Sequence, residues 1–531
     1  MLARIFSASV WGVEALGVEV EVNNTWGDYD TKVVGLPDAA VRESCHRVYT
    51  ALQNSGFKNP LGRTTINLAP ADIRKEGPSF DLPMALGLLA ATDQLRDGKG
   101  QAADPADKSL DRFLIVGELA LSGEVRQVRG VLPIALEAKK QGRLALIVPH
   151  ANAAEAALVP GLRVFPVSTL REAAEIVGDA PARLAALPPN PEPRGDEPAF
   201  QPVDGEWHDL DFADVKGQES VKRAIEIAVA GGHNLLMIGP PGSGKSMLAK
   251  RIPSLFPPLT LDEAIEATKI HSVAGLLPAG QPIVRRRAFR APHHTISDVG
   301  LVGGTANLSP GEVTLAHHGV LFLDELPEFK RTALEVLRQP LEDATVTISR
   351  AAGTMTFPAQ FMLVAAMNPT PTGGFDDARL GKCTPAAIQK YLNKVSGPLL
   401  DRIDIHIEVP AVKRETLMNP GPAESSDAIR HRIVAARQRQ RARFAKSKGK
   451  RKTLCNARMT PKEIREHCVL DESAGLLLTA ALDDLRLSAR AYDRILKVAR
   501  TIADLADADH IGEAEIAEAV QFRSLDRQVW G

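Results

Sequence analysis

Hydrophobic and polar positions follow different rhythms at the two ends of the chain. In the first third, period-two alternation and short apolar runs predict four strands and one helix. The strands are expected near Gly17–Val22, Arg63–Leu68, Phe113–Val116 and Leu144–Val148, and the helix at Leu82–Ala91. Near the C-terminus, apolar residues recur every three or four positions, which is the helical period. The helices expected there span residues 474–485, 489–506 and 513–522.

The middle of the chain carries three continuous apolar runs that each lead into a polar or glycine-rich segment. These runs are residues 234–238, 320–323 and 361–367. Such runs are typical of strands buried on both faces, as in a parallel sheet covered by helices. We therefore expect a three-layer α/β core whose functional residues share one edge of the sheet.

The first apolar run leads into the phosphate-loop pattern G-x-x-x-x-G-K-[ST]. A helical period follows at Met247–Ile252, so strand, loop and helix come in the order that this motif requires. Backbone N–H groups of such a loop wrap a triphosphate at the positive end of the helix, which predicts ATP as the ligand. The alternative is a glycine-rich turn that matches by chance, and the flanking elements argue against it. The cofactor-binding residues predicted here are Gly239, Pro240, Pro241, Gly242, Ser243, Gly244, Lys245 and Ser246.

The residues after the strands have distinct expected roles in ATP hydrolysis. Lys245 is expected to reach the β- and γ-phosphates, and Ser246 and Asp324 to hold Mg²⁺. Glu325 is expected to polarise the attacking water. Asn368 matches the sensor-1 position, which hydrogen-bonds the water or the γ-phosphate. The alternative for Asn368 is a cap on the turn before the following proline.

Composition narrows the function only a little. The chain has 531 residues, with 64 basic and 65 acidic ones, so any nucleic-acid or membrane site must be local. The start of the chain lacks a long apolar run, and we expect neither a signal peptide nor a membrane anchor. Scattered cysteines suit a reducing, cytoplasmic location. They are Cys45, Cys383, Cys455 and Cys468.

These patterns divide the chain into five parts. Clustered prolines and charges at 186–194 predict an extended linker, since clustered proline blocks helix and sheet alike. The expected parts are an α/β domain at 1–170, the linker at 171–207, an ATPase core at 208–412, a basic linker and helix at 413–456, and a helical lid at 457–531.

Three motifs of the first domain, Asn67–Asp72, Lys75–Pro83 and Gly117–Val125, resemble the Lon-protease-like domain of magnesium-chelatase-related ATPases. The resemblance puts Ser79 where that fold keeps a protease serine. A serine nucleophile needs a base, which is a lysine in Lon-type enzymes. The corresponding position here is Leu132, so we expect a domain that is not proteolytic and serves assembly or binding.

The segment Ser396–Asp404 resembles the arginine-finger segment of the helicase and chelatase branch of AAA+ ATPases. The resemblance implies that Arg402 reaches the γ-phosphate of the neighbouring subunit and stabilises transition-state charge. The alternative is a surface ion pair with a neighbouring aspartate. The finger interpretation implies a homo-oligomeric ring in which the arginine acts in trans.

The segment Ser488–Arg494 resembles the sensor-2 signature of the same branch. The resemblance implies that Arg490 contacts the γ-phosphate, while Arg494, one turn later, is structural.

Further segments between and after the phosphate motifs closely resemble the YifB/ComM family of magnesium-chelatase-like AAA+ ATPases. They are Arg287–Ser297, Gly300–Gly304, Leu308–Gly319 and Pro398–Pro410. The resemblance covers nearly the whole chain. It implies a hexameric DNA helicase that promotes branch migration during natural transformation.

One departure from the family concerns metal binding. Members often carry a Cys-Pro-Cys group after the sensor-1 Asn-Pro, whereas this chain has no cysteine in Asn368–Gly374. A structural zinc needs about four ligands, so no zinc is predicted. The histidine pairs at 293–294 and 317–318 are expected to point to opposite faces of a strand and to serve packing or interfaces.

Three basic segments are candidates for DNA contact. Val346–Phe357 alternates around a glycine-containing turn, which predicts a β-hairpin with Arg350 near its tip. The triplet Arg285, Arg286 and Arg287 is the second candidate, and the run of basic residues at 430–452 is the third. The first two are equally open to interpretation as solvated or intersubunit charge. A charge run is usually a solvated face, but the third is long and of one sign in a neutral protein, which favours phosphate binding. Aromatic residues are few in the basic run, so any DNA partner is expected to bind without sequence specificity.

Four functions fit this pattern to different degrees. The first is a ring-forming, DNA-dependent ATPase or helicase. The second is the ATPase subunit of a metal chelatase, although the chain lacks the D-x-S-x-S segment of chelatase partner subunits. The third is a protease, which the leucine at position 132 disfavours. The fourth is a remodeller of a protein partner that uses ATP without responding to DNA.

Overall fold

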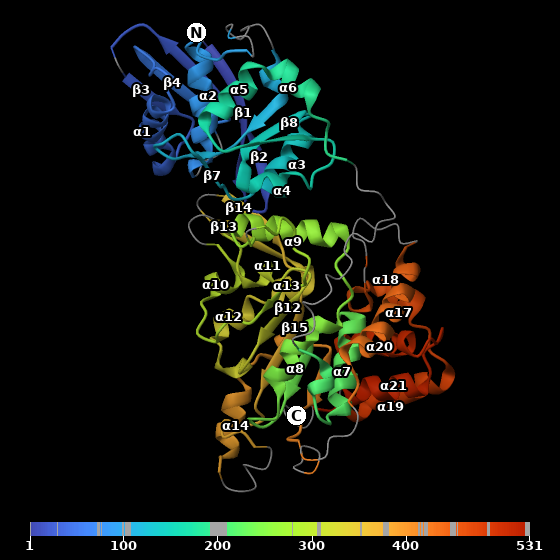
Figure 1. Ribbon diagram of the computed structural model, residues 1–531. Coiled ribbons are helices and arrows are strands. Elements are labelled where there is room, and N and C mark those ends of the chain that lie inside the picture. The colour runs from blue at the N-terminus through green and yellow to red at the C-terminus, as the bar shows by residue number, and fades with distance from the viewer. Residues whose placement is uncertain are drawn as a thin grey trace. The chain divides into compact units, whose positions relative to one another are not determined.

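The computed structural model describes most of the chain in two compact units, whose elements are labelled in Figure 1. The described residues are 2–28, 30–71, 75, 77–97, 100, 108–191, 210–278, 280–304, 309–350, 353–374, 382–412, 415, 418, 423–445, 453, 455–485 and 489–525. The N-terminal unit comprises Met1–Ala199, Leu261–Val284 and Ser349–Met355. The second unit, here called the P-loop unit, comprises Phe200–Thr260, Arg285–Ile348 and Thr356–Gly531.

The N-terminal unit contains a four-stranded sheet in the order β1-β2-β4-β3. Its first two strands form a long antiparallel pair, whereas β3 runs parallel to β4 at the edge. In β2 every second residue from Val18 to Val22 is buried, as the alternation predicted. The strands are β1 Leu2–Trp11, β2 Glu14–Thr25, β3 Asp30–Val34 and β4 Arg63–Ala69.

Helices and a second, three-stranded parallel sheet in the order β5-β8-β9 complete this unit. The helix α2 is buried along nearly its whole length, because it is apolar on all sides. The four predicted strands and the predicted helix are confirmed. The elements are α1 Ala39–Asn54, α2 Asp81–Ala91, β5 Phe113–Ile115, β6 Glu118–Leu119, β7 Val125–Arg126, α3 Val131–Lys140, β8 Ala145–Pro149, α4 Ala153–Ala156 and β9 Arg163–Val167.

The first part of the predicted linker is instead helical. Residues 170–186 form α5 (Leu170–Gly178) and α6 (Ala180–Ala186), so the expectation of an extended chain from residue 171 is wrong. Thr169 caps α5 by accepting a hydrogen bond from the N–H of Glu172. The apolar face of both helices joins the hydrophobic core of the N-terminal unit. The proline cluster that motivated the linker begins only after this packed segment.

Two segments from the ATPase part of the sequence belong to the N-terminal unit. One contains α9 (Leu261–Ala274), which packs against α3. Glu155 joins these elements, because its carboxylate accepts hydrogen bonds from the Leu132 N–H and from the Ser272 hydroxyl. The tip of the predicted hairpin is the other segment. There the Met355 side chain lies against Gly12, where an added Cβ would come within 2.1 Å of the sulfur.

The P-loop unit is built on a parallel five-stranded sheet in the order β11-β12-β15-β10-β16. The residues of β10, β12 and β15 are all buried, as continuous apolar runs predict for a sheet covered on both faces. This confirms the expected α/β core with a parallel sheet. The strands are β10 Leu235–Ile238, β11 Phe289–Arg290, β12 Val320–Leu323, β15 Met362–Met367 and β16 Ile405–Glu408.

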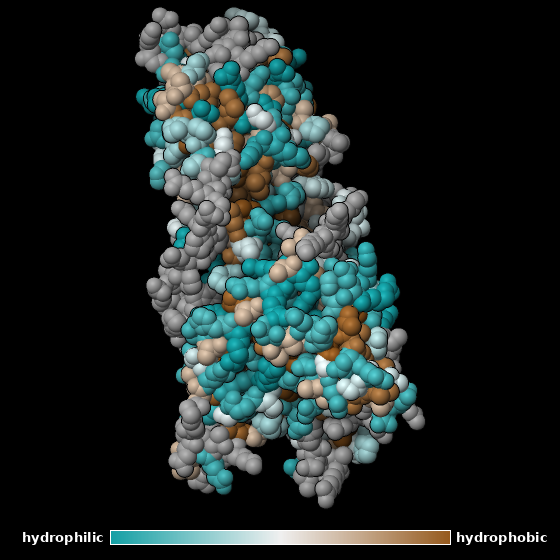
Figure 2. Space-filling view, turned by 90° about the vertical axis from the view of Figure 1, so that its right-hand side faces the viewer, coloured by the Kyte–Doolittle hydropathy of each residue, from teal (hydrophilic) through white to brown (hydrophobic). Residues whose placement is uncertain are grey.

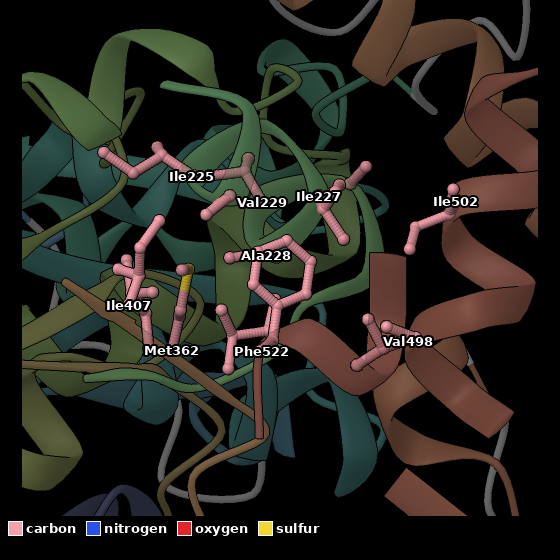
Figure 3. Packing of buried hydrophobic residues seen from close by; sticks show 14 of the residues in the cluster. Ile225, Ile227, Ala228, Val229, Met362, Ile407, Val498, Ile502 and Phe522 are labelled. Carbon is pink, nitrogen blue, oxygen red and sulfur yellow. The ribbon is translucent and has the colours of Figure 1, made fainter. Parts of the chain in front are cut away.

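The helix α7 (Glu219–Gly231) joins the sheet to the C-terminal helices. Its residues from Ala224 onward are all buried, and all of them except Glu226 are apolar or glycine, so this part of the helix is covered on all sides. Figure 3 shows how this is achieved: isoleucine and valine side chains of α7 lie between residues of the sheet and residues of α20. The lid and the ATPase core therefore share one hydrophobic core. The other helices of the core are α8 Lys245–Arg251, α10 Asp298–Val302, α11 Glu312–Leu315, α12 Arg331–Glu335, α13 Arg338–Asp343, α14 Pro385–Leu392 and α15 Gly397–Leu400.

The C-terminal helices confirm the helical period of the sequence. In α20 the apolar residues Ile495, Ala499 and Ile502 are buried at the helical period, and the polar residues Arg500, Thr501 and Asp504 are buried beside them. Figure 2 shows a mainly hydrophilic surface over this part of the P-loop unit. None of the helices in the described ranges is long and apolar enough to cross a bilayer. The helices are α17 Ser426–Phe444, α18 Pro461–His467, α19 Glu472–Leu485, α20 Ala489–Leu505 and α21 Glu513–Gln521.

The hairpin predicted from residues 346–357 is also present. It consists of β13 (Thr345–Arg350) and β14 (Gly353–Pro358), which form a two-stranded sheet. Two cross-strand hydroxyl pairs fix its register: Thr347 with Thr356 at 3.1 Å, and Ser349 with Thr354 at 3.0 Å.

Candidate ATP site

Three parallel strands bring the phosphate motifs to one edge of the sheet. The strand β15 lies between β10 and β12, with Met367 opposite Ile238 and Ala365 opposite Leu323. The carboxyl ends of parallel strands share an edge, and ligands of open α/β sheets bind at that edge. The phosphate loop, the Asp-Glu pair and Asn368 therefore meet as the sequence predicted.

The phosphate loop closes around the side chain of Lys245. Its Nζ donates hydrogen bonds to the carbonyl oxygens of Gly239 at 2.7 Å and Pro240 at 3.0 Å. Gly242 and Gly244 have φ values of 76° and 93°, in the left-handed region that glycine adopts without strain. The two glycines of the motif thus permit the tight loop that precedes α8.

Lys245 also connects the loop to the sensor-1 candidate. Its Nζ donates to Oδ1 of Asn368 at 3.2 Å. Burial lowers the pKa of the Lys245 ammonium group, and the nearby Asp324 carboxylate acts in the opposite direction. A partly buried ammonium held by neutral oxygens is well suited to bind phosphate oxygens in their place.

Ser246 and Asp324 form the second contact of the site. The Ser246 hydroxyl donates to Oδ2 of Asp324 at 2.5 Å, and Oδ1 accepts the backbone N–H of Glu325 at 3.0 Å. A hydroxyl and a carboxylate that face each other offer the hard oxygen ligands that Mg²⁺ prefers. The donor set therefore fits Mg²⁺, and these two side chains are the ones that would hold it.

Glu325 follows Asp324 at the carboxyl end of β12, and its side chain is exposed. Its backbone has φ 53° and ψ 47°, which is left-handed and uncommon for a residue with a side chain. The side chain is 58% exposed, and its Oε2 lies 3.4 Å from Nδ1 of His294. This contact of the histidine was not predicted from the sequence. The signal that was available is its position four residues after the end of β11, the strand next to β12.

Arg402 lies at the opposite end of the sheet from the phosphate loop. Its backbone carbonyl accepts a hydrogen bond at 2.9 Å from the side chain of Asn234, which directly precedes β10. The Arg402 guanidinium pairs with Glu342 and donates to the carbonyl oxygen of Pro398 at 2.6 Å. Its Nε is buried without a hydrogen-bond partner. The ion pair that we expected as the alternative involves Glu342 rather than a neighbouring aspartate.

The two arginines of the sensor-2 segment differ in burial. Arg490 is exposed at the start of α20, with Nη1 3.9 Å from the carboxylate of Asp401. Arg494 forms an ion pair with the buried Asp404, whose other oxygen is 3.3 Å from Nδ1 of His233. Burial alone would raise the pKa of the Asp404 carboxyl, but Arg494 and His233 outweigh it and hold that pKa well below its usual range. Arg494 thus fastens α20 to the sheet.

The candidates for DNA contact have different surroundings. Arg287 donates to the carbonyl oxygens of Pro257 at 3.0 Å and His318 at 2.8 Å, so it is used within the P-loop unit. Arg285 and Arg286 are exposed. Arg350 is exposed at the end of β13.

Most of the arginines in α17, which belong to the basic run, form ion pairs within the protein. The charge of the run alone did not indicate this. Four of them pair with carboxylates of the same unit, and three of these four fasten α17 to other segments. The pairs are Arg430 with Asp427 inside α17, and Arg432 with Glu226 and Glu424, Arg439 with Asp507 and Asp509, and Arg443 with Asp504. The second half of the run, at 446–452, lies outside the described residues. The pairings with Glu226, Asp504, Asp507 and Asp509 were not predicted, because these partners are distant along the chain.

Ser79 sits in a short 3₁₀ helix, Pro78–Phe80, and its carbonyl oxygen accepts the N–H of Gly117 at 3.0 Å. Leu132, at the position predicted for a base, is buried in a hydrophobic cluster. Its N–H donates to Glu155 at 2.8 Å. At the position that the resemblance assigns to a catalytic lysine, this chain therefore has a buried apolar side chain.

The histidine pairs depart from the prediction that neighbours point to opposite faces. The ring centroids are 4.1 Å apart for His293 and His294, and 3.9 Å apart for His317 and His318. Neither pair lies within a strand, so the alternation of strand side chains does not apply.

Comparisons with known proteins agree with this geometry along the chain. The family model "Magnesium chelatase, subunit ChlI" matches residues 211–417. The model "Subunit ChlI of Mg-chelatase" matches residues 18–152, and the model "Magnesium chelatase, subunit ChlI C-terminal" matches residues 423–523. The fold and the site thus define a magnesium-chelatase-like AAA+ ATPase.

Relatives over the full length narrow this class. The chain is 42% identical over 530 residues to "Uncharacterized protein YifB" of Escherichia coli, covering 99% of this chain and 98% of that one. It is 43% identical over 529 residues to "Competence protein ComM" of Haemophilus influenzae, with the same coverage of 99% and 98%. The chain belongs to the YifB/ComM family. A shorter similarity, 27% over 157 residues, covers 28% of this chain and 26% of "Lon protease 2" of Bacillus subtilis.

Proposed function

We propose that the protein is a ring-forming, Mg²⁺-dependent ATPase that couples ATP hydrolysis to translocation on DNA and to branch migration. Membership of the YifB/ComM family supports ATP hydrolysis, and the name of the Haemophilus influenzae relative, a competence protein, supports a DNA substrate. The biological setting proposed is recombination during natural transformation.

The observation that supports a ring of subunits is the separation of Arg402 from the phosphate loop of the same chain. Asn234, which binds the Arg402 carbonyl, precedes β10, and the phosphate loop begins directly after β10. Four strand residues span about 13 Å, so the two features lie at opposite ends of the strand. An arginine finger at this place serves the ATP of another subunit. Arg490, close to Asp401, lies with the finger segment and serves the same neighbour.

Each residue of the site has a defined task in hydrolysis. Lys245 binds the β- and γ-phosphates, and Ser246 and Asp324 hold Mg²⁺, which supplies positive charge next to the phosphates when bound. Glu325 accepts a proton from the attacking water, and Asn368 orients that water or the γ-phosphate. Arg402 of the adjacent subunit stabilises the charge that develops on the γ-phosphate.

The proposed DNA contacts are Arg350, Arg285 and Arg286. All three are exposed, so their guanidinium groups are accessible to a phosphate backbone. Arginine contacts to phosphate carry affinity without sequence information, so binding independent of sequence is expected.

A second candidate function is a metal-chelatase-type ATPase subunit or a remodeller of a protein partner. The observation that favours it is the description of all three family models, which name a magnesium-chelatase subunit. Such a protein hydrolyses ATP in response to its protein partner, and DNA leaves its rate unchanged.

The test of the DNA function is steady-state ATP hydrolysis with and without single-stranded and forked DNA, at several salt concentrations. We expect stimulation by DNA that falls steeply with salt, because phosphate contacts release counterions. Arg350→Ala should lose most of the stimulation, whereas Arg465→Ala, a control on the exposed surface of α18, should retain it. Hydrolysis that ignores every DNA, with the wild type and both variants equal, would contradict the DNA function and favour the protein-remodelling candidate.

The test of the ring is a mixing experiment with two inactive variants, Lys245→Ala and Arg402→Ala. In a mixed ring, the intact phosphate loop of an Arg402→Ala subunit meets the intact arginine of a Lys245→Ala subunit. With random mixing of equal amounts, about one interface in four is intact, so about a quarter of the wild-type rate should return. A mixture that stays inactive would contradict action in trans.

A further inference from the structure

Asn234, which directly precedes β10, binds the arginine-finger segment through both its side chain and its backbone. Its side-chain amide donates to the carbonyl oxygen of Arg402 at 2.9 Å. Its carbonyl oxygen accepts the N–H groups of Asp404 and Ile405, each at 3.1 Å, and its own N–H donates to Oδ2 of Asp404 at 3.3 Å. The side-chain oxygen accepts the N–H of Leu363 in β15 at 2.9 Å. The asparagine therefore joins the arginine-finger segment to β10 and β15.

The residues that follow Arg402 are held by side chains from the C-terminal helices. Arg523 donates to the carbonyl oxygen of Ile403 at 2.6 Å, and Arg494 pairs with the carboxylate of Asp404. Asn234 differs from both, because it binds the carbonyl group of the finger residue itself. The backbone at Arg402 is thus fixed to the amino end of β10.

The guanidinium group of Arg402 has a more easily exchanged partner than its backbone has. It pairs with Glu342, whose side chain is 62% exposed. Ion pairs with exposed groups are weak, so a phosphate can replace this carboxylate. The side chain can therefore change partner while the backbone that carries it stays in place.

A fixed backbone matters for an arginine that acts on another subunit. The long side chain has several torsions, and a small shift of its backbone moves the whole range that the guanidinium can reach. Stabilisation of transition-state charge depends on placement, and an error of about 1 Å can cost about 10²-fold in rate.

We propose that Asn234 is a positioning residue for the arginine finger. By holding the Arg402 carbonyl, it sets the direction from which Arg402 reaches the γ-phosphate bound by the adjacent subunit. Asn234 thus serves the ATP of a neighbour, although it precedes the strand that leads to the phosphate loop of its own chain. The proposal rests on the proposed function, in which Arg402 acts in trans, and is independent of DNA.

The first test is ATP hydrolysis by the full chain in the absence of DNA. Asn234→Ala should lower kcat about tenfold with KM for ATP unchanged, because its own phosphate loop is intact. Asn234→Asp keeps an acceptor for the Leu363 N–H but loses the donor to Arg402, so it should lose as much. A wild-type kcat in either variant would overturn the proposal. The matched control is Gln360→Ala, two residues before β15 at the same end of the sheet, and its kcat should stay within about twofold.

The second test mixes Asn234→Ala with each of the two inactive variants. With Lys245→Ala, the intact loop of the Asn234→Ala subunit meets an intact finger, so about a quarter of the wild-type rate should return. With Arg402→Ala, every loop meets either a misplaced finger or none, so the rate should stay below about a tenth. If Asn234 acted through β10 on its own phosphate loop, the two mixtures would exchange these results, which would overturn the proposal.

Two controls separate the possible failures. Asn234→Ala should bind a fluorescent ATP analogue as tightly as the wild type does. A variant that had only lost its fold would bind less and restore neither mixture, and that result would also overturn the positioning role. If the mixture of Lys245→Ala with Arg402→Ala stays inactive, action in trans fails and the positioning role fails with it. If that mixture is active while the Asn234→Ala mixtures give the exchanged results, the positioning role alone is wrong.

Discussion

Two buried carboxylates, Glu155 of the N-terminal unit and Asp404 of the P-loop unit, are held by different kinds of donor. Glu155 of the N-terminal unit is held by the N–H of Leu132, the hydroxyl of Ser272 and the amide of Asn152, all of them neutral donors. Asp404 of the P-loop unit is held by Arg494 and by His233. Burial raises the pKa of Glu155, whereas the cations lower that of Asp404.

The same contrast holds for the candidate catalytic residues. In the N-terminal unit, the position that the resemblance assigns to a catalytic base holds a buried leucine, and the Glu155 carboxylate caps α3 and joins it to α9. In the P-loop unit, Lys245, Asp324 and Asn368 converge at the accessible edge of a sheet. The polar groups around Glu155 therefore hold structure together, whereas those at this edge are placed to bind a ligand.

The largest expected effect is loss of hydrolysis in Glu325→Gln. General-base catalysis is worth about 10²- to 10⁴-fold, so kcat should fall by about three orders of magnitude. Binding of ATP should persist, because Lys245 and the loop are unchanged. The measurement is steady-state hydrolysis together with equilibrium nucleotide binding. A variant that keeps more than about a tenth of the wild-type rate would show that another group accepts the proton.

The next effect is on stability, in Asp404→Asn. This change removes the charge that Arg494 pairs with, and an uncompensated buried cation costs about 3 kcal/mol. A carboxyl whose folded pKa is lowered contributes stability above its unfolded value, near pH 4, and loses it as pH falls through the folded pKa. Urea unfolding of the full chain at pH 7 should show the whole loss, and the wild type should approach the variant in acid. Equal midpoints at pH 7 would contradict the role of this ion pair.

A smaller effect of opposite sign is expected in Glu155→Gln. A carboxyl whose folded pKa is raised contributes most stability below its unfolded value, near pH 4, and loses it as pH rises through the folded pKa. Glutamine keeps an oxygen acceptor for Leu132 and avoids the buried charge. The variant should therefore be more stable than the wild type by about 1 kcal/mol at pH 8, and the difference should shrink in acid. Urea midpoints at the two pH values check this, and a variant that is much less stable at pH 8 would contradict it.

The smallest effect is expected in Ser79→Ala. Because the residue at position 132 is an apolar leucine, removing the serine hydroxyl should leave ATP hydrolysis unchanged and should change the free energy of unfolding by no more than about 0.5 kcal/mol. Assays of the wild type with unstructured protein substrates should show no cleavage. Peptide cleavage that disappears in Ser79→Ala would overturn the comparison between the two units.

Much of the fold could be predicted, because its strands and helices leave local patterns of apolar and polar residues in the sequence. The period-two alternation of β2, the apolar runs of β10, β12 and β15 and the helical period of α20 each reflect a face that had to be buried. The phosphate loop was recognisable because its spacing is set by the geometry of a strand, a turn and a helix. The prediction of an extended linker was wrong for residues 171–186, because the proline cluster follows the packed helices rather than interrupting them.

Contacts between residues distant along the chain were beyond such patterns. The charge of α17 suggested a phosphate-binding face, but Arg432 and Arg443 pair with Glu226 and Asp504 of the same unit. The assignment of α9 to the N-terminal unit depends on Glu155 and Ser272, which lie more than a hundred residues apart in the sequence.

The sequence by itself therefore determined three things about this protein. They are which segments form strands and helices, where the phosphate-loop motif lies, and which family the motifs resemble. Only the tertiary structure decided which groups each charged side chain contacts. A charge acts on whatever lies within a few ångströms of it, and those neighbours come from strands and helices brought together only by packing. His294 opposite Glu325 and Arg402 at the far end of β10 are two such results.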